Sequence, residues 1–99
     1  MHYLLIYTTA PDYLERRAQF RDEHLVMAWN AARDEGLLLG GAVGDPPDGA
    51  MLLWNVESPD VIERFANADP YVINGLVTQW SIKPWKTVVG ADAASPVVP

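Results

Sequence analysis

The chain has 99 residues, 13 acidic and 7 basic side chains for a net charge of −6, and no cysteine. A chain of this length forms one domain, and its acidic balance argues against binding to nucleic acid or to an anionic membrane. The lack of cysteine excludes disulfides, thiolate metal sites and a cysteine nucleophile. The sequence shows neither a basic leader nor an apolar run of about 20 residues. We therefore expect a cytoplasmic protein that binds neither nucleic acid nor membrane.

The first half of the chain predicts a strand, a helix and a second strand. Residues 1–9 are apolar, aromatic or β-branched without a breaker, which favours a buried strand. Asp12 and Glu15 have the spacing of a capping box, which begins a long helix that Gly36 ends. Residues 37–43 form the second strand, where two adjacent glycines indicate a bulge or a close approach to the backbone. The helix should face the core with an apolar stripe made of Leu14, Ala18, Leu25, Ala28, Trp29 and Ala32.

The second half predicts a strand, two short helices and a final strand. A turn rich in glycine and proline precedes the third strand, at residues 50–57. A Ser-Pro pair then caps and begins a helix at residues 59–68, and the Asp-Pro pair that follows begins a further short helix in the same way. The last strand covers about residues 79–89, and its Pro84 marks a sheet edge or a bulge.

This order of elements is that of a ferredoxin-like α+β sandwich with βαββαβ topology, in which a four-stranded antiparallel sheet has both helices on one face. One such domain accounts for residues 1–90, and residues 91–99 form a flexible C-terminal tail. The first, third and fourth strands are apolar on both faces, and the chain holds four tryptophans and four tyrosines. We therefore expect the open face of the sheet to meet a second copy, which makes the protein a homodimer.

His24 is the main candidate for acid–base chemistry. It lies in the middle of the long helix, on the flank of the apolar stripe, where the backbone needs no side-chain partner. The alternative is an aromatic side chain that only packs at the edge of the core. His2, the other histidine, lies at the start of a strand and is expected at the surface or in an interface.

A histidine base needs a carboxylate that orients it, and two aspartates compete for that role. Asp34 follows His24 by ten residues, which places them about 15 Å apart along one helix. Asp69 ends the second helix, and antiparallel packing of the two helices brings that end toward the first half of the long helix. This topology favours Asp69, although a cap for the turn at Pro70 also accounts for it.

Three further side chains are candidates for ligand binding. Arg21 lies one helical turn before His24, where a cation would hold an anionic group of the ligand and stabilise an enolate or phenolate as it forms. Its alternative is a surface ion pair along the helix. Tyr71 and Trp54 are expected to line a pocket, although core packing is the commoner fate of such residues.

The usual signatures of other chemistries are missing. The chain has no G-x-G-x-x-G, no P-loop, no H-E-x-x-H and no G-x-S-x-G. Because it also has two histidines far apart in sequence, we expect neither a metal site nor a bound cofactor.

Taken together, several short motifs resemble the YCII-related (YciI-like) family over residues 1 to about 89. These motifs are the first strand with its two tyrosines, Arg21-x-x-His24-Leu25, Asp34-Glu35-Gly36, Ala66-Asn67-Ala68-Asp69-Pro70-Tyr71 and Lys83-Pro84-Trp85. The resemblance implies a ferredoxin-like fold that dimerises as an α+β barrel, with a cleft centred on a histidine and an aspartate. His24 matches the histidine, and both Asp69 and Asp34 match recurrent family positions. The loop at residues 44–49 and the tail after residue 90 depart from the family pattern, which leaves the substrate open.

The resemblance includes a member that eliminates HCl from a chlorinated hydroquinone. It therefore implies a cofactor-independent lyase or isomerase that acts on a small cyclic or aromatic molecule, with His24 as general base or acid and Asp69 orienting it. Two alternatives stay open. One is a dimer that binds a small ligand or a partner without catalysis, and the other is a cofactor-free monooxygenase, which rests on fold analogy alone.

Overall fold

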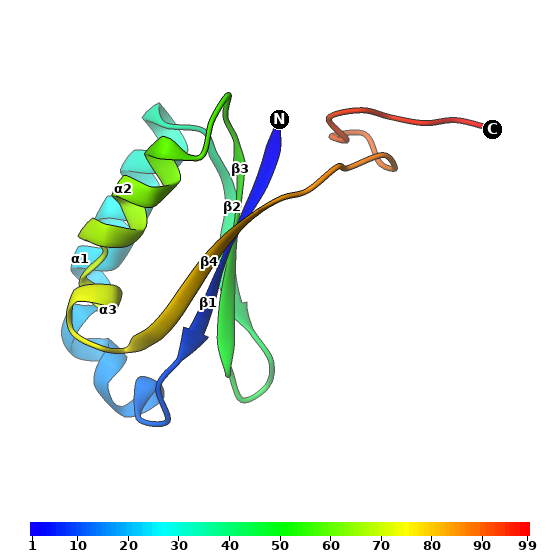
Figure 1. Ribbon diagram of the computed structural model, residues 1–99. Helices are drawn as coiled ribbons and strands as arrows, with labels where there is room; N and C mark the ends of the chain where they lie inside the picture. The colour runs from blue at the N-terminus through cyan, green and yellow to red at the C-terminus, as the bar shows by residue number, and fades with distance from the viewer.

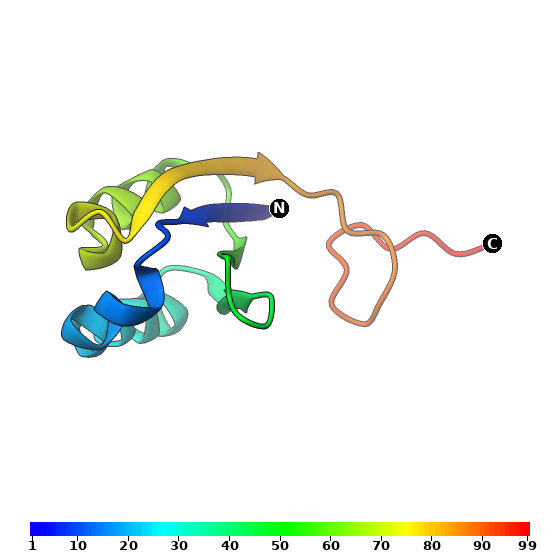
Figure 2. The same ribbon diagram turned by 90° about the horizontal axis from the view of Figure 1, so that it is seen from below.

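The computed structural model describes all 99 residues and has the predicted α+β architecture (Figure 1). Four antiparallel strands form one sheet in the order β2-β3-β1-β4, and the helices cover one of its faces (Figures 1 and 2). The elements are β1 His2–Thr9, α1 Tyr13–Asp34, β2 Leu37–Val43, β3 Gly49–Asn55, α2 Asp60–Ala68, α3 Pro70–Ile73 and β4 Val77–Pro84. This arrangement confirms the ferredoxin-like βαββαβ fold.

The core lies between the sheet and the helices. Leu5 and Tyr7 of β1 pair with Leu52 and Ala50 of β3, so alternate residues of both strands point toward the helices. The side chains enclosed there are Leu5, Tyr7, Leu52, Trp54, Ile62, Phe65, Ala66, Tyr71, Leu76 and Val77. From α2, Ile62, Phe65 and Ala66 are buried, and Val61 packs partly against the core. Because of this alternation, Tyr7 is one of the β1 residues that point toward the helices.

The other face of the sheet is open to solvent and is apolar over β2, β3 and β1. The side chain of Leu39 is 71% exposed and that of Met51 is 38% exposed. In β4 the register places Ser81 opposite Ile6 and Lys83 opposite Leu4, so this strand presents polar side chains on the open face. The expectation that the last strand is apolar on both faces is therefore wrong.

The long helix uses a different face for the core from the one predicted. Its buried residues are Tyr13 and Ala31, with Phe20 and Met27 packed partly against the core. By contrast, the members of the predicted stripe are largely exposed, and Trp29 is 71% exposed. Two apolar faces thus exist on α1, and the periodicity did not show which one is buried in the core. The predicted capping box also does not form, since the Asp12 side chain makes no cap hydrogen bond.

The end of the chain differs from the prediction as well. The last strand ends at Pro84 rather than near residue 89, and the segment after it continues along the N-terminus, where the Trp85 N–H donates to the His2 carbonyl at 2.9 Å. His2 is 4% exposed and its Nδ1 lies 2.7 Å from Thr87 Oγ1, so it is not a surface residue. Beyond this point the chain extends away from the sheet (Figures 1 and 2). None of the helices is both long enough and apolar enough to cross a membrane.

Candidate active site

His24 and Asp69 meet where α1 crosses the start of α3. The distance from His24 Nδ1 to Asp69 Oδ1 is 2.9 Å, although 45 residues separate them in sequence. The histidine side chain keeps 16% of its surface exposed, whereas the aspartate side chain is fully enclosed. Because a carboxylate can only accept hydrogen bonds, Nδ1 of the neutral ring carries the proton and donates it to Oδ1. The contact therefore leaves Nε2 as the unprotonated nitrogen.

Asp69 is fixed by three donors. Tyr7 donates from its Oη to Oδ2 at 2.7 Å, and the Tyr71 backbone N–H donates to Oδ1 at 3.0 Å. The residue before a proline is restricted to extended backbone, and Asp69 has φ −65° and ψ 124° ahead of Pro70 at the first position of α3. The capping geometry that accounts for an Asp-Pro pair thus also aims the other carboxylate lone pairs at Tyr7 and His24. Asp69 therefore caps α3 and contacts His24 at the same time.

Tyr7 acts as a hydrogen-bond donor in this cluster because its proton is held tightly. Burial, the negative charge of Asp69 and the hydrogen bond to that carboxylate all raise the pKa of Tyr7 far above its usual range. Its phenol therefore stays protonated at any physiological pH and donates to Oδ2. The pKa of Tyr71 is also raised, chiefly by burial.

An aromatic stack sets the plane of the imidazole. The His24 ring lies on the Tyr71 ring with centroids 4.0 Å apart and an interplanar angle of 11°, and Tyr13 meets Tyr71 edge-on with centroids 5.8 Å apart. Within the chain, Nε2 of His24 makes no hydrogen bond, and it is not among the buried unsatisfied atoms. Stacking and the Asp69 contact together fix the ring while one nitrogen stays available.

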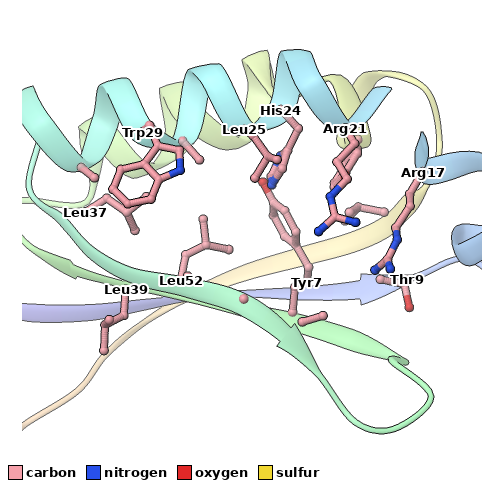
Figure 3. A pocket seen from close by; sticks show the side chains of 18 of the residues that line it. Tyr7, Thr9, Arg17, Arg21, His24, Leu25, Trp29, Leu37, Leu39 and Leu52 are labelled. Carbon is pink, nitrogen blue, oxygen red and sulfur yellow. The ribbon is translucent and has the colours of Figure 1, made fainter. Parts of the chain in front are cut away.

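His24 lines a cavity of about 370 Å³ between α1 and the sheet (Figure 3). The walls are mostly apolar, with Leu25 and Trp29 on the helix and Leu37 and Leu52 on the strands. The residues of the predicted core stripe that lie in the second half of α1 are thus the pocket wall instead. A pocket of this size suits a small molecule with one ring.

Two arginines are the only permanently charged residues that line the cavity. Arg21 lies one helical turn before His24 and Arg17 one turn earlier, and both side chains extend from α1 toward the sheet near Tyr7 and Thr9 (Figure 3). Arg17 also lies over the Tyr13 ring, with its guanidinium carbon 5.7 Å from the centroid. Neither arginine forms an ion pair, in contrast to Arg16 and Arg33 of the same helix.

Two of the sequence candidates lie elsewhere. Asp34 is at the exposed end of α1, where its Oδ2 lies 3.6 Å from Arg33 Nε. Trp54 is fully buried and packs edge-on against Phe65 with centroids 5.2 Å apart, so it belongs to the core and not to the pocket. Tyr71 does line the pocket, as expected.

Two residues of the site were not singled out from the sequence. Tyr7 is one of the alternate β1 residues that face the helices, and the signal that could have found it is that alternation. Arg17 lies four residues before Arg21, which places both on one helix face. Nowhere in the chain do three His, Asp or Glu side chains lie together in a way that could hold a metal ion.

The match to known proteins covers most of the chain. The YCII-related domain matches residues 1–86. Proteins named YciI from Escherichia coli O6:H1 and from Shigella flexneri are each 32% identical over 100 residues, which span 89% of this chain and 99% of theirs. The chain therefore belongs to the YCII-related domain family.

Solved structures share the fold at lower identity. The 5-chloro-2-hydroxyhydroquinone dehydrochlorinase TftG from Burkholderia phenoliruptrix AC1100, in complex with 2,5-dihydroxybenzoquinone, superposes with a TM-score of 0.73 at 23% identity, over 88% of this chain and 95% of that one. Rv0793 from Mycobacterium tuberculosis gives a TM-score of 0.52 at 13% identity, over 92% and 97% of the two chains.

Proposed function

We propose that this protein is an enzyme that carries out a lyase or isomerase step on a small cyclic or aromatic molecule, with His24 and Asp69 as its acid–base pair. The observation that carries the proposal is the 2.9 Å contact between His24 Nδ1 and the enclosed Asp69, which leaves Nε2 free beside a cavity. Enclosed carboxylates that orient a histidine are a recurrent device of general acid–base catalysis. The dehydrochlorinase that shares the fold, TftG, supports an elimination on an aromatic ring.

In this mechanism Nε2 of His24 takes a proton from a C–H or O–H group of the bound molecule. The electron pair released forms a new double bond, and the leaving group departs with its own electron pair, as chloride does in a dehydrochlorination. Asp69 holds the ring in the tautomer that accepts at Nε2 and stabilises the imidazolium that forms. Arg21 stabilises the negative charge that develops on the substrate oxygen. The proton on Nε2 then returns to product or to solvent.

Chloride release from a panel of chlorinated hydroquinones, which includes 5-chloro-2-hydroxyhydroquinone and analogues with a ring carboxylate, tests this function directly. Wild type is expected to release chloride above the spontaneous rate, and His24→Gln and Asp69→Asn are expected to lose at least 100-fold of that excess, in line with the usual contribution of a positioned base. Arg33→Gln, which alters an exposed arginine at the far end of α1, serves as the matched control. Binding of 2,5-dihydroxybenzoquinone without turnover of any of a panel of halogenated hydroquinones would favour a non-catalytic binding module instead.

We also propose that two copies associate through the open sheet face. Leu39 and Met51 are exposed there, and Val43 is 44% exposed. A continuous apolar surface of this kind on a chain of 99 residues favours burial against an identical surface. The polar outer face of β4 would lie at the rim of such an interface.

A further inference from the structure

We infer that Arg17 and Arg21 form a carboxylate-binding subsite at one end of the cavity, so that the molecule that reacts at His24 carries a permanent carboxylate. This inference rests on the proposed function and narrows it to a class of substrate, namely ring compounds with one carboxylate arm. In the proposed function Arg21 stabilises charge that develops during the reaction. The subsite adds Arg17 and a group on the substrate that is charged before any reaction begins.

Positive charge at this end of the cavity is not balanced by an acidic side chain in the pocket wall. The chain has nearly twice as many acidic as basic side chains, yet no aspartate or glutamate lines the pocket. Arg17 and Arg21 lie on one helix face, where like charges four residues apart repel each other. Arg16 and Arg33, outside the pocket, each have an aspartate within 4 Å. Neither of the two pocket arginines therefore has an ion-pair partner within the chain.

Tyrosine rings in the cavity wall lie close to both arginines. Arg17 lies over the Tyr13 ring, and this contact holds its guanidinium beside the cavity. The positive charges of Arg21 and Arg17 both lower the pKa of Tyr71, against the burial that raises it. Both guanidinium groups thus lie close to the ring that supports His24. Both therefore border the same cavity as His24, with Arg17 partly buried and Arg21 exposed to solvent.

The dimensions of the helix give the size of the ligand. At 1.5 Å of rise per residue, Arg21 and Arg17 lie about 4.5 Å and about 10.5 Å from His24 along the axis of α1. Trp29 lies about 7.5 Å from His24 in the opposite direction, at the apolar end of the pocket (Figure 3). A single ring at His24 with a carboxylate attached to it spans the distance to the arginines, and its other edge meets the apolar wall.

A carboxylate fits this end better than a phosphate does. Phosphate sites commonly use backbone N–H groups of a glycine-rich loop or a helix N-terminus. Here the donors are two guanidinium groups on the side of a helix, flanked by Tyr13 and Tyr71, and planar guanidinium groups pair well with planar carboxylates.

The test compares a matched pair of probes, 2,5-dihydroxybenzoate and its neutral amide 2,5-dihydroxybenzamide, by isothermal calorimetry on the full chain. Wild type is expected to bind the carboxylate at least 10-fold more tightly than the amide, and this preference should shrink as sodium chloride rises from 50 to 500 mM. Arg17→Gln and Arg21→Gln should each remove most of the preference by weakening only the carboxylate. Arg17→Lys should recover part of it, and Arg33→Gln should leave it unchanged.

Three results would overturn the subsite: equal affinity for the two probes in wild type, no binding of either, or arginine variants that weaken both probes alike. Tighter binding of phenyl phosphate than of benzoate would overturn the assignment to a carboxylate. His24→Gln separates this inference from the proposed function, because the preference for the carboxylate should survive in that variant. A preserved preference without any turnover would contradict only the enzyme proposal.

Discussion

Tyr7 Oη donates a hydrogen bond of 2.7 Å to Asp69 Oδ2 and so joins the middle of the sheet to the residue that orients His24. The bond connects β1 to the start of α3 across 62 residues of sequence. Because Asp69 is fully enclosed, its carboxylate depends on protein donors for every lone pair that water would otherwise satisfy. Tyr7 is therefore part of the support of the site even though it lies on the sheet beneath it.

Removal of the Tyr7 hydroxyl should destabilise the protein. Tyr7→Phe leaves Asp69 Oδ2 enclosed without its partner, and a buried polar group left unpaired costs about 1–3 kcal/mol. Urea unfolding followed by circular dichroism measures this loss at pH 7. Tyr3→Phe is the matched control, because Tyr3 is another β1 tyrosine, is less buried and does not contact Asp69. Equal stability of the two variants would contradict the importance of this bond.

The stability of the protein should fall in alkaline solution. The pKa values of Tyr7 and Tyr71 are raised in the folded chain, whereas an unfolded chain releases these protons near pH 10.0. Above that pH the folded state binds more protons than the unfolded state, so the free energy of unfolding decreases by up to about 1.4 kcal/mol per pH unit for each tyrosine. Below it, the contribution of the two phenols is complete.

Urea midpoints measured from about pH 8 to pH 11 test this dependence. Above pH 10 the urea midpoint should fall less steeply with pH in Tyr7→Phe than in wild type, because the variant lacks one of the two tyrosine hydroxyls whose pKa is raised. Comparison with the variant also removes the contribution of every titratable group that the two proteins share. An identical slope in the two proteins would show that Tyr7 ionises as freely in the folded chain as in the unfolded one.

The sequence predicted the fold because each element carries its own local signal. Strand periodicity, the Asp-Pro pair that begins α3 and the glycine that ends α1 are all short-range features. The contact between His24 and Asp69 could also be anticipated, since antiparallel helix packing favours Asp69 over Asp34 on topology alone. Trp54 could not be placed in the same way, because a tryptophan in a central strand satisfies the pattern of a core residue and that of a pocket residue equally well.

The helix face that meets the core could not be predicted, and the reason is physical. α1 carries one apolar face that is buried in the core, with Tyr13 and Ala31, and another that lines the cavity, with Leu25 and Trp29. A pocket that accepts an apolar ring needs an apolar wall, which looks like core in a sequence. Arg17 could not be predicted for a related reason. A charged side chain on a helix looks like a surface residue in a sequence, and only the structure shows that Arg17 lies beside a cavity.

Filling the pocket from β2 should weaken ligand binding without unfolding the chain. A Cβ atom on Gly40 would lie 3.3 Å from Leu52 Cγ, so the side chain of Gly40→Val would enter the cavity beside Leu52. Valine suits a strand, and the shift of Leu52 costs about 1 kcal/mol, so stability should change little. Binding of 2,5-dihydroxybenzoate should weaken at least 10-fold.

Gly41→Ala is the control for the loss of a glycine from β2, because Gly41 pairs with Met51 on the open sheet face and a Cβ atom there meets no other atom within 4 Å. It should bind the probe as wild type does. Undiminished binding by a folded Gly40→Val would show that the probe binds outside this cavity.

The open sheet face gives a prediction about self-association. Leu39→Lys introduces a charge into the apolar surface that we propose to be buried between two copies, where an unpaired charge costs several kcal/mol. Sedimentation equilibrium should show a dimer for wild type and a dissociation constant at least 100-fold higher for the variant. Ser81→Lys, on the polar outer face of β4, should change it much less. A wild-type chain that stays monomeric at 100 μM would contradict the association.

The proposed chemistry depends on the orientation of the His24 ring, and the ¹⁵N chemical shifts of its two imidazole nitrogens measure this orientation most directly. The chain has two histidines, so a His2→Asn variant leaves a single imidazole to observe. With the ring neutral, Nδ1 should be the protonated nitrogen that donates to Asp69, and Nε2 should be unprotonated and shift when 2,5-dihydroxybenzoate is added. In Asp69→Asn the preference for the proton on Nδ1 over Nε2 should weaken or reverse. A proton on Nε2 in the wild-type ring, with Nδ1 unprotonated, would contradict a base oriented by Asp69.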